Sequence, residues 1–103
     1  MKSEKVIFIN EELEESFNNL PEKDPTKKAL IKAINSIKED CQIGRNVKKK
    51  LIPKKYNLTN LRIYNLPSAW RLLYTITTSN NIEIISIILD WMNHKDYERL
   101  FGF

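Results

Sequence analysis

The chain has 103 residues, of which 42% are hydrophobic and 29% are charged, and its formal net charge is +4. This composition supplies one apolar core and excludes a disordered, collagen-like or low-complexity chain, while the lone cysteine excludes an internal disulfide and a cysteine-based zinc site. No apolar run approaches the roughly 20 residues that span a bilayer, so we expect a single domain over residues 1–103, in the cytoplasm and without membrane contact.

The first predicted elements are a strand and a helix. Residues 5–9 are mostly β-branched or aromatic, which favours a strand. Asn10 is a suitable N-cap for the helix that follows, and Pro21 ends that helix. Its apolar residues recur with helical spacing and form one face: Leu13, Phe17 and Leu20.

A second helix is predicted to begin at Asp24 and Pro25, an N-cap followed by the residue that the first turn tolerates best. The helix is predicted to end at Gly44. Its apolar stripe consists of Leu30, Ala33, Ile34, Ile37 and Cys41. Both helices are amphipathic, so we expect them to pack side by side on one face of a sheet.

A basic connector without clear periodicity follows, over residues 45–56. Residues 25–55 contain ten Lys or Arg and two acidic residues, a net charge of +8, whereas residues 1–24 carry −4 and residues 56–103 balance at zero. This concentration favours a polyanionic or acidic partner, and a solvated, mobile connector is the alternative interpretation. The side chains expected to contact phosphates are Arg45, Lys48, Lys49, Lys50, Lys54 and Lys55.

Three strands are predicted in the second half of the chain, over residues 58–66, 70–77 and 82–89. The last is apolar on both faces, so we expect it in the centre of the sheet. Residues 90–103 suit a short helix or a tail. Three aromatic residues there are expected to cover the remaining core: Trp91, Phe101 and Phe103. The order β-α-α-β-β-β predicts an α+β domain, with two N-terminal helices packed on one face of an antiparallel sheet.

Strand alternation predicts which side chains share a face of that sheet. In residues 58–66 the apolar side chains alternate with Arg62 and Tyr64, and in residues 70–77 they alternate with Arg71. If both apolar sets face the helices, these three polar side chains lie together on the open face. Two guanidinium groups suit a phosphate, and a phenol ring suits a base. A solvated face that carries arginines for solubility is the alternative.

The only histidine, His94, precedes Tyr97 by three residues, which makes the two side chains neighbours on a helix or turn. Imidazole exchanges protons near neutral pH, and a phenol donates a hydrogen bond or stacks. A surface histidine beside a core tyrosine is the alternative. The sequence contains no Gly-x-Ser-x-Gly motif, no phosphate-binding glycine loop and no cluster with metal-ligand spacing, so we expect neither metal nor cofactor.

Two motifs within residues 61–103 resemble the RelE/ParE superfamily of toxins from type II toxin–antitoxin systems. The first is an aromatic-Arg-hydrophobic-hydrophobic-Tyr run over residues 70–74, in the segment LRIYNLPSAWRLLYTI. The second is His-Lys-x-Tyr over residues 94–97, which is similar to the RelE-type ribonuclease branch rather than to the gyrase-poisoning ParE branch. The N-terminal half resembles the superfamily only in its predicted order of elements.

The resemblance implies a toxin that cuts messenger RNA without a metal, usually in the ribosomal A site, by attack of the RNA's own 2′-hydroxyl group on the adjacent phosphate. Arg71 matches the family arginine that stabilises phosphate charge, while Arg62 and Tyr64 fall where some members carry lysines. His94 and Tyr97 fall in the region that supplies the acid or base and the stacking group. Because a guanidinium group is too basic to act as a general base, His94 assisted by Tyr97 is the expected proton carrier.

The resemblance also implies partners: messenger RNA, the ribosome and a small, typically acidic antitoxin, in an oligomeric toxin–antitoxin complex. A family member that binds RNA without cutting it, or that binds a protein target in the manner of ParE, is the alternative. No acidic residue is predicted to face the site, unless Glu83 or Asp90 lies nearer than strand alternation suggests.

Overall fold

The computed structural model describes residues 1–102, which form an α+β fold with a five-stranded mixed sheet and three α-helices. The sheet order is β1–β5–β4–β3–β2. The strands are β1 (Lys5–Phe8), β2 (Arg45–Asn46), β3 (Arg62–Asn65), β4 (Arg71–Ser79) and β5 (Glu83–Met92). The helices are α1 (Glu11–Asn18), α2 (Pro25–Glu39) and α3 (His94–Phe101), and three short 3₁₀ turns are η1 (Lys49–Leu51), η2 (Lys54–Tyr56) and η3 (Pro67–Ala69).

The first two helices begin at the predicted caps. The side chain of Asn10 accepts a hydrogen bond from the backbone N–H of Leu13 at 2.8 Å, and that of Asp24 accepts one from Thr26 at 2.7 Å. Each bond satisfies a backbone donor that has no partner within its helix. None of the helices in residues 1–102 has the length and apolarity needed to cross a bilayer.

The sheet is mixed rather than antiparallel. β1 runs parallel to β5, with Lys5 opposite Ile85 and Phe8 opposite Ile88, while every other neighbouring pair is antiparallel. The prediction of a purely antiparallel sheet is therefore wrong. β5 lies inside the sheet, between β1 and β4, but the middle strand of the five is β4, so the prediction of a central β5 is only partly confirmed. The predicted order lacked β2, which has only two residues and no periodicity to detect.

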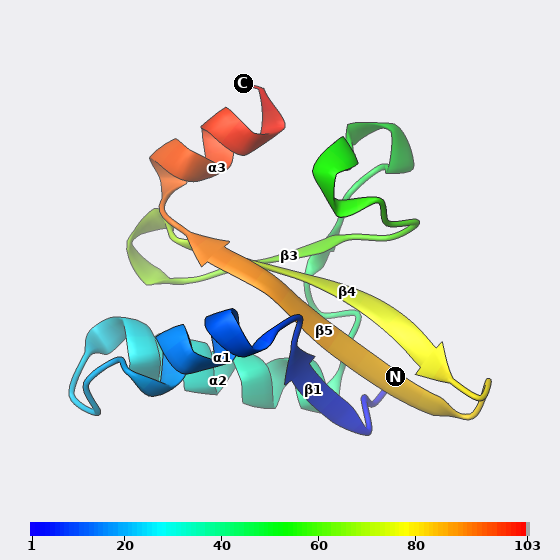
Figure 1. The fold of residues 1–103 in the computed structure, drawn as a ribbon, viewed down its shortest axis with the longest axis horizontal. Coiled ribbons are helices and arrows are strands. Elements are labelled where there is room, and N and C mark those ends of the chain that lie inside the picture. The colour runs from blue at the N-terminus through cyan, green and yellow to red at the C-terminus, as the bar shows by residue number, and fades with distance from the viewer. Residues whose placement is uncertain (103) are drawn as a thin grey trace.

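Helices α1 and α2 cover one face of the sheet, which we call the helix face (Figure 1). Its core contains apolar residues of α2 and alternate residues of β4 and β5, and Trp91 packs at its edge. The buried members of this core are Leu30, Ala33, Ile37, Cys41, Leu66, Leu72, Tyr74 and Ile88. Packing of two amphipathic helices on one face confirms that part of the predicted fold.

The other face, which we call the far face, is covered by α3 and by the segment that contains η1 and η2 (Figure 1). These elements enclose a second core, which consists of Val47, Ile52, Leu61, Ile63, Leu73, Leu89, Met92 and Tyr97. Phe101 packs against this core, as its predicted covering role requires, and the same prediction for Phe103 lies outside the described residues. The expected open sheet face is therefore partly closed.

Candidate functional site

The register between β3 and β4 decides on which face each predicted site residue lies. Arg62 is opposite Tyr74 and Tyr64 is opposite Leu72, and residues opposite each other in an antiparallel pair share a face. Tyr74 and Leu72 belong to the helix-face core. Arg62 and Tyr64 therefore lie on the helix face.

Arg71 lies on the far face, opposite Asn65 of β3 and Met92 of β5. The prediction that Arg62, Tyr64 and Arg71 lie together is wrong. Alternation correctly separated the polar from the apolar residues of β3, but the apolar ones pack into the far-face core instead of against α1 and α2.

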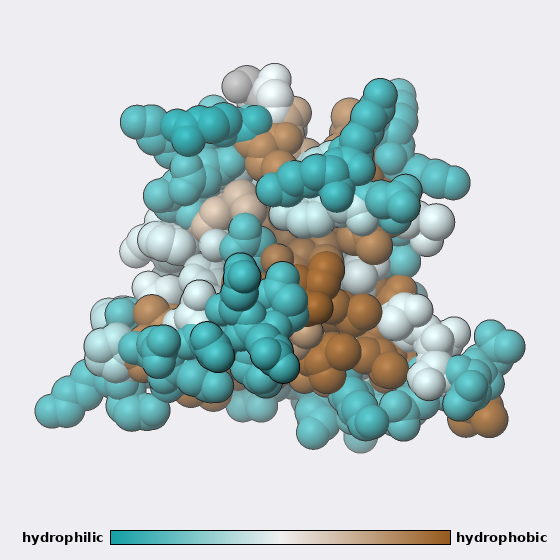
Figure 2. Space-filling view, in the orientation of Figure 1, coloured by the Kyte–Doolittle hydropathy of each residue, from teal (hydrophilic) through white to brown (hydrophobic). Residues whose placement is uncertain are grey.

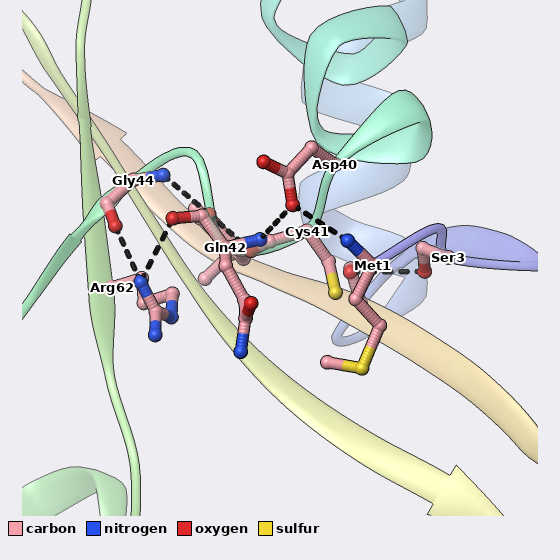
Figure 3. Close-up of polar contacts among 9 residues, drawn as sticks. Met1, Ser3, Asp40, Cys41, Gln42, Gly44 and Arg62 are labelled. Carbon is pink, nitrogen blue, oxygen red and sulfur yellow. Dashed lines mark hydrogen bonds and ion pairs between the residues drawn. The ribbon is translucent and has the colours of Figure 1, made fainter.

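Arg62 holds the loop between α2 and β2. Its Nη1 donates hydrogen bonds to the carbonyl oxygens of Gln42 at 3.0 Å and Gly44 at 2.7 Å (Figure 3). The Tyr74 hydroxyl donates to the carbonyl of Cys41 at 2.6 Å and accepts from the Gly44 N–H at 2.9 Å. Burial raises the pKa of Tyr74 to about 12, so this hydroxyl stays protonated and keeps donating. These contacts give Arg62 a structural role in the loop.

Three other predicted residues meet beneath α3. The guanidinium carbon of Arg71 lies 5.4 Å from the centroid of the Tyr97 ring, and Nη2 of Arg45 donates to the Tyr97 hydroxyl at 3.1 Å. Tyr97 is only 6% exposed, so its phenol is held against two guanidinium groups. We call Arg45, Arg71 and Tyr97 the arginine–tyrosine cluster. A cation above an aromatic face is attractive, and the two positive charges remain directed toward the same region.

Arg71 keeps an unused donor. Its Nη1 donates to the carbonyl of Trp70 at 3.2 Å, but within residues 1–102 its buried Nε has no hydrogen-bond partner. A buried donor without a partner costs about 1–3 kcal/mol, and more when the group is charged. An anionic oxygen placed here would remove this cost, so the arrangement suits a phosphate or carboxylate.

His94 is the first residue of α3 and lies beside the cluster. Its ring centroid is 6.5 Å from that of Tyr97, with an interplanar angle of 25°. Its Nε2 lies 2.8 Å from a carboxylate oxygen of Glu98. The two side chains form an ion pair when both ring nitrogens of His94 are protonated and the ring is positively charged. The His94 side chain is 53% exposed, so a substrate can reach it.

A pocket of about 230 Å³ opens next to the arginine–tyrosine cluster. Its lining residues are Arg45, Asn46, Val47, Lys48, Leu51, Ile63, Tyr97 and Phe101. Figure 2 shows the molecule hollowed between α3 and the segment that carries η1, with apolar atoms on the inner walls and hydrophilic residues outside. The hollow therefore combines apolar walls with basic side chains at its rim.

The basic connector is an anchored segment. Val47 and Ile52 are buried in the far-face core, which fixes the backbone on either side of η1. The six basic residues predicted to contact phosphates are all exposed: Arg45, Lys48, Lys49, Lys50, Lys54 and Lys55. The structure thus places all of them on the segment that borders the far face, whereas Tyr64 lies on the helix face.

Alternation failed at Asp90 because β5 contains a β-bulge. Tyr74 is opposite Ile88, but the preceding residue of β4, Leu73, is opposite Asp90, so Leu89 is an extra residue. The bulge resets the alternation and brings Asp90 onto the far face, which Leu73 also occupies. No sequence signal marks this bulge.

Asp90 lines a second pocket, of about 490 Å³, on the far face. The other lining residues are Lys55, Trp70, Trp91, Met92, Asp96, Arg99 and Leu100. Burial raises the pKa of Asp90, and the Trp91 backbone N–H, which donates to Oδ1 at 2.9 Å, opposes this shift. Nearby, the buried hydroxyl of Tyr56 has no hydrogen-bond partner within residues 1–102. A half-buried carboxyl group in a pocket is a candidate for proton transfer.

Comparison of the chain with protein-family models, with curated proteins and with solved structures gives no match. Among residues 1–102, no group of three or more His, Cys, Asp or Glu side chains is arranged to hold a metal ion. The function is therefore inferred from the far-face geometry and from the two sequence motifs.

Proposed function

We propose that the chain is the toxin of a type II toxin–antitoxin system, a cytoplasmic, metal-independent endoribonuclease of the RelE type that cleaves messenger RNA on the ribosome and so inhibits translation. One observation carries the proposal. Arg71 of the first motif lies against Tyr97 of the second, although the whole of β5 separates them in sequence. A family arginine and a family tyrosine that meet in space support a shared site.

The chemistry of RNA cleavage fits the side chains of this cluster. As the 2′-oxygen attacks the phosphorus, negative charge grows on the non-bridging oxygens of the phosphate. Arg71 and Arg45 supply positive charge and N–H donors for those oxygens, including the unused Nε of Arg71. His94, exposed at the start of α3, is the proposed donor of the proton that the leaving 5′-oxygen needs.

Arg62 and Tyr64 are not part of this proposed site, because both lie on the helix face. Lys48, Lys49 and Lys50 are the proposed contacts to the RNA backbone on either side of the cut. The same concentration of positive charge suits the acidic antitoxin, with which the toxin is proposed to form an oligomeric complex.

The decisive experiment adds the purified chain to translating ribosomes and maps new 5′ ends on the messenger RNA. We expect cuts within codons in the A site, and a loss of about 10²–10³-fold in cleavage rate for Arg71→Ala. Lys32→Ala is the matched control, because it removes an exposed positive charge from α2 on the other side of the sheet. Its cleavage rate should equal that of the wild type.

Two results contradict the proposal. Intact messenger RNA with stalled ribosomes indicates a protein that binds RNA without cutting it. Intact messenger RNA with normal translation indicates a protein target, in the manner of ParE, or an inactive relative.

A further inference from the structure

We propose that Asp90 is a catalytic residue of the proposed cleavage site on the far face, which contains the arginine–tyrosine cluster and His94. Asp90 is the base that accepts the proton of the RNA 2′-hydroxyl group. This inference rests on the proposed function and deepens it, because it supplies the acidic residue that strand alternation alone does not place at the site. The β-bulge in β5 is the observation that carries it.

The bulge places Asp90 on the same face as Arg71. Asp90 is opposite Leu73, and the next pair of that face joins Arg71 to Met92. Asp90 and Arg71 are therefore diagonal neighbours on adjacent strands. Such neighbours lie about 7–8 Å apart, a separation that a nucleotide's phosphate and 2′-hydroxyl group can bridge. Without the extra residue Leu89, Asp90 would be directed into the apolar core under α1 and α2. β-bulges commonly redirect a side chain next to an active site.

The carboxylate of Asp90 is not neutralised by the protein. Within residues 1–102 it makes one hydrogen bond, from the Trp91 backbone N–H, and no ion pair. The charged and titratable groups that face it are Lys55 and Tyr56 from η2 and Asp96 and Arg99 from α3, with Arg71 on the neighbouring strand. A half-buried carboxylate without a dedicated partner costs stability, and such costs are typical of sites kept for function.

Asp90 and His94 flank the cluster from two sides. In phosphoryl transfer the attacking and the leaving oxygens lie roughly in line, on opposite sides of the phosphorus, so a base and an acid are needed on opposite sides. Asp96 shares the Asp90 pocket, and His94, two residues earlier on α3, projects about 200° away around the helix. Tyr97 projects between Asp96 and His94 around α3, and Arg71 lies against its buried ring.

In the proposed step, one proton moves from O2′ to Asp90 and another moves from His94 to O5′. The Asp90 carboxylate takes the proton of the 2′-hydroxyl group while the bond from O2′ to phosphorus forms. The bond from phosphorus to O5′ breaks, its electron pair stays on O5′, and O5′ takes a proton from the His94 imidazolium. The products are a 2′,3′-cyclic phosphate and a 5′-hydroxyl end, and exchange with water then restores both side chains.

The first test compares Asp90→Asn with Glu83→Gln in single-turnover cleavage of messenger RNA on the ribosome. Glu83 is the matched control because it lies on the same strand, far from the bulge and paired with Lys5 at 3.5 Å. We expect Asp90→Asn to cleave about 10²–10⁴-fold more slowly and Glu83→Gln to cleave at the wild-type rate. Both variants should bind RNA that carries 2′-deoxy substitutions at the scissile nucleotide as tightly as the wild type, which shows that they are folded.

A second substrate distinguishes the residue that acts as the base from the residue that acts as the acid. RNA with sulfur in place of the scissile 5′-oxygen releases a thiolate, which needs no proton from the protein. This substrate should restore cleavage by His94→Gln but not by Asp90→Asn. Restored cleavage by Asp90→Asn would instead make Asp90 the acid and overturn its assignment as the base.

The remaining outcomes separate this inference from the proposed function. If Asp90→Asn cleaves normal RNA at the wild-type rate while Arg71→Ala does not, Asp90 has no catalytic role and the ribonuclease proposal stands. If the wild-type chain leaves RNA intact in every assay, both proposals are wrong.

Discussion

Arg62 and Arg71 differ in how the protein uses their donors. Nη1 of Arg62 is bound to two backbone carbonyl oxygens, at 2.7 and 3.0 Å, whereas Arg71 gives a single bond of 3.2 Å and keeps a buried Nε without a partner in residues 1–102. Hydrogen bonds from a guanidinium group to backbone carbonyl oxygens hold a loop in one conformation. The unpaired Nε on the other face is buried, so a ligand can bond it only once the surrounding side chains shift.

Substitution of the two arginines should therefore have opposite effects. Arg62→Ala should lower the free energy of unfolding by about 1.5–3 kcal/mol, because hydrogen bonds to a charged group are lost, and should leave the single-turnover cleavage rate nearly unchanged. Arg71→Ala should cleave about 10²–10³-fold more slowly and leave stability nearly unchanged. Urea denaturation and cleavage assays on both variants check this. An Arg62→Ala protein of normal stability that fails to cleave would restore the catalytic role predicted from sequence.

Asp90 should make the stability of the fold depend on pH. Burial raises its pKa, so between the pKa of the unfolded chain and that of the native state the native state binds more protons. The contribution of this carboxyl group to the free energy of unfolding therefore falls as pH rises through that interval. Asn cannot ionise, so Asp90→Asn should unfold at a higher urea concentration than the wild type at pH 7.

The difference in unfolding urea concentration between Asp90→Asn and the wild type should vanish well below the ordinary carboxyl pKa of 3.8. There the wild-type carboxyl group is protonated in both the native and the unfolded state. Urea titrations at pH 7 and below 3.8 measure both conditions, with Glu83→Gln as the control. A variant less stable than the wild type at pH 7 would mean that the ionised carboxylate is stabilised in the fold.

At the scale of elements, the most accurate predictions came from short sequence patterns, such as helix caps and runs of apolar residues. The starts of α1 and α2 were predictable because each cap bonds a backbone N–H only two or three residues away. That β5 lies inside the sheet and not at its edge was predictable from apolar residues on both of its faces. The prediction that the second helix ends at Gly44 is wrong, because α2 ends at Glu39; a glycine fits at position 44 for another reason, since a Cβ there would lie 2.7 Å from the Tyr74 side chain.

The features that sequence reasoning missed depend on contacts between distant segments. Alternation shows which residues of a strand share a face, but it does not show whether that face meets α1 and α2 or the far-face core. The apolar residues of β3 meet the far-face core, so Arg62 was assigned to the wrong side. A single bulge at Leu89 likewise reverses every later assignment on β5. The contacts of Arg71 and Arg45 with Tyr97 were not predicted, because they depend on the packing of α3 on the far face.

Across the whole molecule, the two sides of the sheet differ in charge balance: α1 and α2 on the helix face carry charges of both signs, whereas the segment with η1 and η2 carries only basic ones. The first turn of α1 carries three acidic residues next to the helix face, while the basic side chains of the segment with η1 and η2 border the far face. Such separation orients a protein as it approaches a polyanion, with the far face leading. The candidate site lies on the side that nucleic acid would reach first.

The salt dependence of RNA binding tests this orientation. Replacement of Lys48, Lys49 and Lys50 by Gln should reduce the slope of log affinity against log salt by about 0.7 for each lysine that contacts a phosphate of single-stranded RNA. The matched control replaces three exposed lysines of α2: Lys28, Lys32 and Lys38. This control should keep the wild-type slope for RNA that carries 2′-deoxy substitutions at the scissile nucleotide. Equal slopes for the two triple variants would exclude the far face as the RNA-binding side.

The parallel pairing of β1 with β5 also bears on when the molecule can assemble. Residues 5–8 find their partner only in residues 85–88, and Tyr97 follows on α3. Contacts so distant in sequence form late and slowly, because a long loop must close before they do. A nascent chain therefore lacks a complete sheet until residue 92 has been added and lacks an arginine–tyrosine cluster until residue 97 has been added. Under the proposed function, the ribosome that makes this chain is not exposed to its activity while those residues are still being added.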